Sequence, residues 1–163
     1  MRIGQGWDIH RLAPGRALVL GGVIIPSELG EVGHSDGDVL YHAVVDAMLG
    51  AIAAGDIGRH FPPSDQRWKD APSSIFAERA ARILADAGWR PVNVDATVIL
   101  ERPRLAPYID AIRASIAAAV GMPADAVSVK AKTHEGVDAA GRLEAVEAQA
   151  VVLVERIDGG TPR

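Results

Sequence analysis

An alternation of apolar and polar residues, broken only at Ile99, marks residues 92–101, VNVDATVILE, as a β-strand. Its apolar face carries five residues: Val92, Val94, Ala96, Val98 and Leu100. Because successive side chains of a strand point to opposite faces, this strand is buried on one face only. The chain is therefore expected to build a sheet that is covered on one face.

The same patterns predict the other elements. Strands are expected at residues 2–10, in two short runs within 17–26 broken by Gly21-Gly22, at 126–133 with Val127, Val129 and Ala131 on the core face, and at 144–157. Helices are expected at 36–54, 74–87 and 107–120, each followed by a glycine. Irregular connections are expected at 27–35, 56–74 and 134–142.

This order of elements favours an α+β class. We expect a sandwich of a mainly antiparallel or mixed sheet with helices on one face. The uncovered face of that sheet would need a partner, which indicates an oligomer. A length of 163 residues suits one domain, placed at 1–157, and residues 158–163, DGGTPR, are expected to be a flexible tail.

Composition excludes several functions. The chain has no cysteine, so it has neither a disulfide framework nor a thiolate metal site, and any zinc must use histidine and carboxylate ligands. With a net charge of −4 and no basic block, nucleic acid is not an expected partner. No run of 18 apolar residues occurs, and the first ten residues lack the apolar core of a signal peptide. No membrane partner is expected, and we expect a cytoplasmic location.

Titratable residues gather around the predicted helix at 36–54. Asp8 and His10 lie two apart on the first strand, so their side chains share one face. Together with His42 they offer two nitrogens and one carboxylate, a three-ligand zinc set with the fourth position open. Asp38, His42 and Asp46 share one stripe of the helix, so either aspartate could hold the other nitrogen of His42.

Ordinary structural explanations compete with this metal site. A lone histidine such as His42 is often a boundary residue of an amphipathic helix. Asp36 and Asp38 are well placed to stabilise a helix N-terminus, with Ser35 as its N-cap and Asp38 completing a capping box. The Asp8–His10 pair alone is a weak signal.

Two further segments could carry chemistry. Residues 132–136, KTHEG, form a polar tip at the end of a predicted strand, where catalytic residues often lie, or they are an ordinary strand end. Residues 55–65, GDIGRHFPPSD, could close over a substrate or could be a surface connection.

Five segments of the chain resemble the 2-C-methyl-D-erythritol 2,4-cyclodiphosphate synthase family of the non-mevalonate isoprenoid pathway. They read RIGQGWDIH, LGGVIIP, HSDGDVLYHAVVDAMLGAIAAGDIGRHFP, NVDATVI and VKAKTHEG…GR, and the third is highly specific. The resemblance covers residues 1 to about 157.

The resemblance implies a homotrimer with active sites between neighbouring subunits. Each site would cyclise 4-diphosphocytidyl-2-C-methyl-D-erythritol 2-phosphate and release CMP. Zn2+ would be bound by Asp8, His10 and His42, and a second divalent ion, Mg2+ or Mn2+, by Glu135. His34 and Thr133 would be the catalytic residues that stabilise the transition state.

The resemblance also implies a larger set of substrate-binding residues. These are Asp8, His10, His34, Ser35, Asp56, Ile57, Gly58, Phe61, Pro62, Pro63, Ser64, Asp65, Leu100, Arg104, Leu105, Ala106, Lys132, Thr133, His134, Glu135 and Arg142. Residues 100–106 and 132–135 would form the cytidine pocket. The helix N-terminus at Ser35 and Asp36 would offer free N–H groups to a substrate phosphate.

This sequence departs from the family pattern at several positions, and two of these departures bear on function. Lys132 stands where threonine is frequent, so its role is open. Residues 137–142, VDAAGR, lack the aromatic residue expected near position 139, which counts against an isoprenoid-diphosphate ligand in a central cavity.

Two alternatives to cyclisation stay open at this point. The first is a zinc hydrolase that uses a metal-bound water and yields no cyclic product. The second is a non-catalytic trimeric module that binds a nucleotide or an isoprenoid diphosphate.

Overall fold

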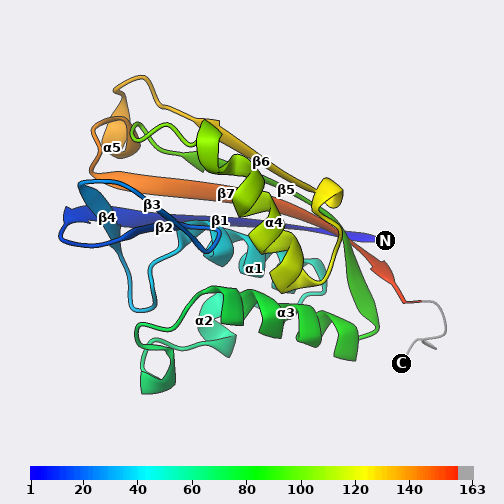
Figure 1. Ribbon diagram of the computed structural model, residues 1–163. Coiled ribbons are helices and arrows are strands. Elements are labelled where there is room, and N and C mark those ends of the chain that lie inside the picture. Colours follow the sequence, from blue (N-terminus) through cyan, green and yellow to red (C-terminus); the bar gives the residue numbers. More distant parts are fainter. Residues whose placement is uncertain (158–163) are drawn as a thin grey trace.

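A computed structural model describes residues 1–157 of the chain as one mixed sheet with helices packed against it (Figure 1). The strand order is β4-β1-β7-β5-β6. Its strands are β1 (Arg2–Pro14), β4 (Leu29–Val32), β5 (Trp89–Ile99), β6 (Val127–Lys132) and β7 (Ala145–Arg156). The β5–β6 pair is parallel, and the other pairs are antiparallel. A separate hairpin joins β2 (Leu18–Leu20) to β3 (Val23–Ile25), as the Gly21-Gly22 break predicts.

The three long helices lie on one face of the sheet (Figure 1). They are α1 (Val39–Ala51), α3 (Ser74–Asp86) and α4 (Ile109–Val120). Short elements complete the fold: α2 (Ile57–His60), α5 (Asp138–Gly141) and three 3-10 turns at Gln66–Trp68, Ala106–Tyr108 and Ala124–Ala126. The predicted α+β architecture with a mixed sheet is confirmed.

Helix α1 lies directly on strand β1, and two glycines make this possible. A Cβ atom on Gly4 would come within 1.9 Å of the carbonyl oxygen of Ala47, and one on Gly6 within 2.0 Å of that of Ala43. Both obstacles are helix backbone, which cannot rotate aside as a side chain can. The approach brings the first turn of α1 against the strand that carries Asp8 and His10.

The other face of the sheet is uncovered in the single chain. Ile3, Trp7, Ile9 and Val151 are 68%, 50%, 39% and 37% exposed. In β1 these exposed residues alternate with Gly4, Gly6, Asp8 and His10, which face the helix side.

Several predicted boundaries are wrong. Residues 29–32, expected in a loop, form β4, because they pair with an extension of β1 to Pro14. Short helices also occupy parts of the expected irregular segments 56–74 and 134–142. Ala131, expected in the core, is exposed, because it lines a surface pocket at the end of β6. The predicted tail, 158–163, lies outside the described residues.

The start of the central helix also differs from expectation. Helix α1 begins at Val39 rather than Asp36, and its N-cap is Asp38, not Ser35. Gly37 has φ +84°, a left-handed conformation that breaks the helical path before Asp38. Within residues 1–157 no helix has the length and apolarity that crossing a membrane requires.

Candidate active site

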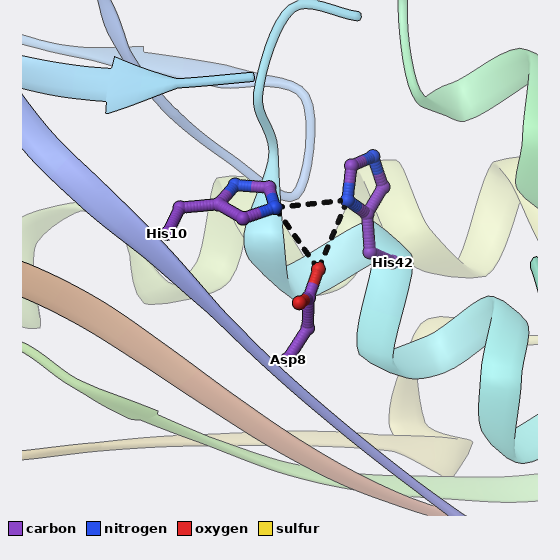
Figure 2. Close-up of side chains that lie close together, drawn as sticks. All are labelled: Asp8, His10 and His42. Atoms are coloured by element: carbon purple, nitrogen blue, oxygen red, sulfur yellow. Dashed lines mark hydrogen bonds and ion pairs between the residues drawn. The ribbon is translucent and has the colours of Figure 1, made fainter. Parts of the chain in front are cut away.

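Three side chains converge where α1 meets β1 (Figure 2). Asp8 Oδ2 lies 3.0 Å from His10 Nε2 and 3.1 Å from His42 Nδ1, and the two nitrogens are 3.3 Å apart. Tetrahedral zinc with bonds of about 2.0–2.1 Å places its ligand atoms about 3.3 Å from one another. The three atoms therefore already have the spacing of zinc ligands, and the sequence prediction that they share one site agrees with this geometry.

The second nitrogen of His42 is bound by serines, not by aspartates. His42 Nε2 lies 3.2 Å from Ser35 Oγ and 3.1 Å from Ser73 Oγ. Ser73 Oγ donates its hydrogen to Asp36 Oδ1 at 2.5 Å, so it is available to accept one from His42. This chain of hydrogen bonds places the proton of a neutral His42 on Nε2 and leaves the Nδ1 lone pair facing Asp8 and His10.

The predicted partners of His42 are wrong. Asp38 instead accepts hydrogen bonds from the backbone N–H groups of Gly21 and Gly22, at 2.9 and 2.6 Å. Asp46 accepts one from the N–H of Ile57 at 2.7 Å. Helical spacing does put these aspartates near His42 in sequence, but each is used to attach a separate loop to α1.

His10 is oriented by the loop that precedes α1. Its Nδ1 lies 2.5 Å from the carbonyl oxygen of Gly37 and 3.1 Å from Glu31 Oε2. Both partners are acceptors, so Nδ1 carries a proton and Nε2 points its lone pair at the cluster once deprotonated. Glu31 is fully buried, and among residues 1–157 its Oε1 atom has no hydrogen-bond partner.

The metal-free cluster is a set of strongly coupled ionisable groups. Burial alone would lower the pKa of His10, but its hydrogen bonds to Asp8 and Glu31 outweigh burial and raise that pKa to about 10. Burial would raise the pKa of Asp8, yet hydrogen bonds from His10 and His42 hold it well below its usual range. Burial raises the pKa of Glu31 to about 7 even though His10 opposes this shift. Asp8 is thus a carboxylate at neutral pH, suited to a cation.

The N–H groups at the start of α1 are not free to bind an anion. The N–H of Val39 donates to Glu31 Oε2, and those of Leu40 and Tyr41 donate to Asp38 Oδ1. The N–H group of Asp36, expected to be free, donates to the carbonyl oxygen of Ala71 at 3.1 Å, so that part of the expectation is wrong. The contact of Ser35 with a substrate phosphate stays a prediction. The exposed side chain of His34, which precedes the helix, is left to face solvent.

A pocket of about 200 Å3 joins the two segments expected to bind cytidine. It is lined by Leu100, Glu101, Pro103, Arg104, Leu105, Ala106, Ala131, Lys132 and Thr133. The lining ends at Thr133. His134, expected in the same pocket, turns its imidazole to Asp138 instead, with 2.6 Å between Nδ1 and Oδ2.

The expected substrate residues between 56 and 65 differ in burial and in the contacts they make. Phe61 is buried against Phe76 and Trp68, with ring centroids 4.8 and 5.5 Å away, so its side chain belongs to the core. The side chain of Asp56 caps α2, whose first residues include Ile57 and Gly58. Pro63 and Ser64 are exposed, Pro62 is partly buried, and Asp65 pairs with Arg67.

Two more expected residues lie on the loop after β6. Thr133 Oγ1 donates to Glu135 Oε1 at 3.1 Å. Arg142 Nε donates to Glu144 Oε1 at 2.9 Å, and both side chains are exposed. Ser35, expected at a phosphate, is 4% exposed and uses its hydroxyl behind His42.

The sequence analysis missed the residues that orient the two histidines of the cluster. Glu31 and Ser73 lie 21 and 31 positions from the histidines they contact. The only local signal was a glutamate inside a short segment that could pair as a strand. Nothing near Ser73 pointed to His42.

Comparison with known proteins finds similar sequences over most of the chain. The YgbB family model matches residues 1–155. The 2-C-methyl-D-erythritol 2,4-cyclodiphosphate synthase of Dechloromonas aromatica is 55% identical over 156 residues, 96% of this chain and 98% of that protein. The protein of the same name from Chromobacterium violaceum is 58% identical, over 94% of this chain and 97% of its own length.

Solved structures are similar as well. A 2C-methyl-D-erythritol-2,4-cyclodiphosphate synthase in a CDP-bound form superposes with a TM-score of 0.87 at 40% identity, over 94% of this chain and all of that chain. IspF of Plasmodium falciparum in a CDP complex gives 0.83 at 35% identity, over 95% and 96% of the two chains.

Proposed function

The chain belongs to the YgbB family, and we propose from that premise how its own residues serve the family reaction. It is an enzyme of isoprenoid biosynthesis that converts 4-diphosphocytidyl-2-C-methyl-D-erythritol 2-phosphate to 2-C-methyl-D-erythritol 2,4-cyclodiphosphate and releases CMP. The observation that carries the proposed mechanism is the convergence of Asp8, His10 and His42 at zinc-ligand spacing.

The donor set fits zinc. It consists of two imidazole nitrogens and one carboxylate, and each histidine has its other nitrogen hydrogen-bonded by a protein acceptor. A bound Zn2+ would supply neutralisation of phosphate charge and Lewis-acid polarisation. Glu135, exposed beside Thr133, fits a second ion such as Mg2+ or Mn2+, which binds through one or two carboxylates together with substrate phosphates.

The main task of the protein in this reaction is to position the 2-phosphate and the diphosphate of the substrate. An oxygen of the substrate's 2-phosphate forms a bond to the β-phosphorus, and the bond from that phosphorus to the bridging oxygen of CMP breaks. The attacking phosphate is already an anion, so no side chain has to act as a nucleophile. Holding both ends of one molecule in the ring-forming geometry can lower the barrier by roughly 7–11 kcal/mol.

We assign the cytidine end to the pocket at residues 100–106 and 132–133, with Lys132 beside the phosphates. His34, exposed next to the metal cluster in sequence, and Thr133 would donate hydrogen bonds to charge that develops in the transition state. The other family-implied contacts stay predictions, apart from that of His134, whose imidazole faces Asp138 rather than the pocket. CDP in the similar solved structures supports a cytidine nucleotide as the ligand.

We propose a homotrimer in which one chain's pocket faces the metal cluster of its neighbour. Strand β6, at the pocket, is three strand spacings from β1, about 14 Å across the sheet. The exposed apolar side chains of β1 and β7 would be buried between subunits. A cytoplasmic location is likewise proposed.

Phosphorus NMR of the protein with substrate, Zn2+ and Mg2+ tests the proposed chemistry. CMP together with two coupled cyclodiphosphate resonances is the expected outcome. CMP with an open-chain phosphate would indicate the metal-dependent hydrolase instead. Substrate binding without turnover would leave only a binding module and would contradict the mechanism.

Replacing Ser73 with alanine is expected to weaken zinc binding by about 10–100-fold. The hydroxyl holds His42 in the tautomer whose Nδ1 faces the cluster, and loss of such an outer partner typically costs that much affinity. Competition with a fluorescent zinc chelator measures it. Ser74→Ala is the matched control, because the Ser74 side chain makes no hydrogen bond within residues 1–157; equal affinities for the two variants would refute the tautomer argument.

Zinc affinity is expected to rise with pH up to about pH 10. The pKa of metal-free His10 is raised to about 10, so below that pH the ion must displace a proton from it. We expect about one proton released from His10 per zinc at pH 8, and about a tenfold gain in affinity per pH unit. Calorimetry in buffers of different ionisation enthalpy counts the protons. Proton release unchanged in His10→Gln would contradict the assignment.

A further inference from the structure

A second cluster of metal-binding side chains lies at the start of β7. His134, Asp138 and Glu147 each offer one ligand atom, and the three atoms lie within 4.8 Å of one another. His134 and Asp138 come from the loop and short helix after β6, and Glu147 comes from the third position of β7.

This cluster is separate from the one that contains Asp8 and His10. Glu147 pairs with Ile9, and paired residues of neighbouring strands point to the same face. Ile9 lies between Asp8 and His10, so its side chain and that of Glu147 point to the opposite face of the sheet. Any ion held by Glu147 is thus on the face away from α1.

The ligand atoms are arranged by the surrounding backbone. Asp138 Oδ1 accepts hydrogen bonds from the N–H groups of Ala140 and Gly141, which leaves Oδ2 directed at His134 Nδ1, 2.6 Å away. Glu147 Oε2 accepts a hydrogen bond from the indole N–H of Trp7 at 3.3 Å. The other carboxylate oxygen of Glu147 has no hydrogen-bond partner in the described part of the chain.

The charge of the cluster is not neutralised. Neither Asp138 nor Glu147 forms an ion pair with a lysine or arginine among residues 1–157. The nearby Arg142 is paired with Glu144 instead. Two carboxylates beside one imidazole leave a net negative charge that a divalent cation would balance.

We propose that His134, Asp138 and Glu147 form a third divalent-metal site, separate from the sites of both ions of the reaction. One imidazole nitrogen and two carboxylate oxygens suit Mn2+, Fe2+, Co2+ or Zn2+, with water in the remaining positions. In the single chain all three side chains are at least partly exposed, and in the proposed trimer the site would lie on the sheet face that the subunits share. The alternative is an ion pair of His134 and Asp138 that never takes up a metal.

Trp7 provides a readout that does not depend on activity. Its indole touches Glu147, whereas the other two tryptophans lie elsewhere, at the 3-10 turn Gln66–Trp68 and at the start of β5. Paramagnetic Mn2+ added to zinc-loaded protein without substrate is expected to quench Trp7 fluorescence. Trp7→Phe should remove this quenching and so assign it.

Asp138→Asn is the decisive variant. Asn tolerates the left-handed backbone at this position, φ +60°, and its amide oxygen can still accept from Ala140 and Gly141. The fold is therefore retained while a charged ligand is lost. We expect the Mn2+ concentration for half-quenching to rise at least about tenfold, and Glu147→Gln, which can still accept from Trp7, to do the same.

Glu135→Gln is the matched control, since Glu135 is the proposed ligand of the catalytic second ion. It should leave the quenching unchanged while impairing turnover. Quenching lost in Glu135→Gln but kept in Asp138→Asn would mean that the ion sits at the reaction site, and the inference would fail. Absence of quenching at millimolar Mn2+ would also overturn the proposed metal site, and it would not contradict the proposed reaction.

Discussion

Replacing His42 with alanine is expected to remove the bound zinc and to lower kcat by roughly a thousandfold. Only Asp8 and His10 would remain, and two ligands do not hold zinc in a closed site. A Lewis-acid ion contributes several kcal/mol to stabilising charge in a transition state, and each 1.4 kcal/mol is a factor of ten in rate. Metal content by mass spectrometry and CMP release measure the two effects.

His60→Ala is the control for His42→Ala. Within residues 1–157 the hydrogen-bonding partner of His60 is the carbonyl oxygen of Ala54, to which Nε2 donates away from the cluster, so zinc content should be unchanged. Thermal unfolding of both variants in excess chelator shows whether the protein still folds. A His42→Ala variant that kept its zinc and most of its turnover would exclude the cluster as the catalytic metal site.

Replacing Gly4 with alanine is expected to destabilise the protein by about 3 kcal/mol or more. The new Cβ would lie 1.9 Å from the carbonyl oxygen of Ala47 and 2.5 Å from the nitrogen of Ala51. Helix α1 would have to move off the strand, and overpacking of this kind costs about 1–3 kcal/mol even against movable side chains. Gly6→Ala should behave alike, since its Cβ would lie 2.0 Å from the carbonyl oxygen of Ala43.

Gly50→Ala separates this clash from a general effect of removing a glycine. Gly50 lies in α1, its Cβ would meet nothing closer than the carbonyl oxygen of Gln5 at 3.9 Å, and alanine favours the helix. A gain of up to about 1 kcal/mol is expected. Urea unfolding at one protein concentration gives the free energies of unfolding of Gly4→Ala, Gly6→Ala and Gly50→Ala. If Gly4→Ala lowered the free energy of unfolding by less than Gly50→Ala raised it, the result would contradict the close packing of α1 on β1.

The three proposed zinc ligands could be chosen from sequence because their signals are local. Asp8 and His10 share a face through the two-residue period of a strand, and His42 stands in an apolar helix. Once the strand and the helix pack together, only side chains on the helix-facing side of β1 can contact His42. The prediction failed for their supporting partners, where Asp38 and Asp46 had the right helical spacing but Ser35 and Ser73 make the contact.

The same division holds for the fold. Helices with clear apolar stripes and glycine ends, such as the one at 109–120, were predicted closely. Strand β4 was missed because four residues carry too short a pattern, and it exists only because the extended end of β1 offers hydrogen bonds. The predicted helix start at Asp36 failed because Gly37 adopts a positive φ and the carboxylate of Asp38 caps the first turn.

By itself, then, the sequence determined the α+β class, the elements with strong periodicity, and the residue types that can bind zinc without cysteine. These properties depend on neighbours a few positions apart. Only the tertiary structure decided that Glu31 and Ser73 orient the histidines, that the first N–H groups of α1 are already occupied, and that His134 faces Asp138 and Glu147. Apart from the His134–Asp138 pair and the capping of α1 by Asp38, these contacts join different elements of the fold. Their packing depends on glycine positions such as Gly4 and Gly6 that no local pattern reveals.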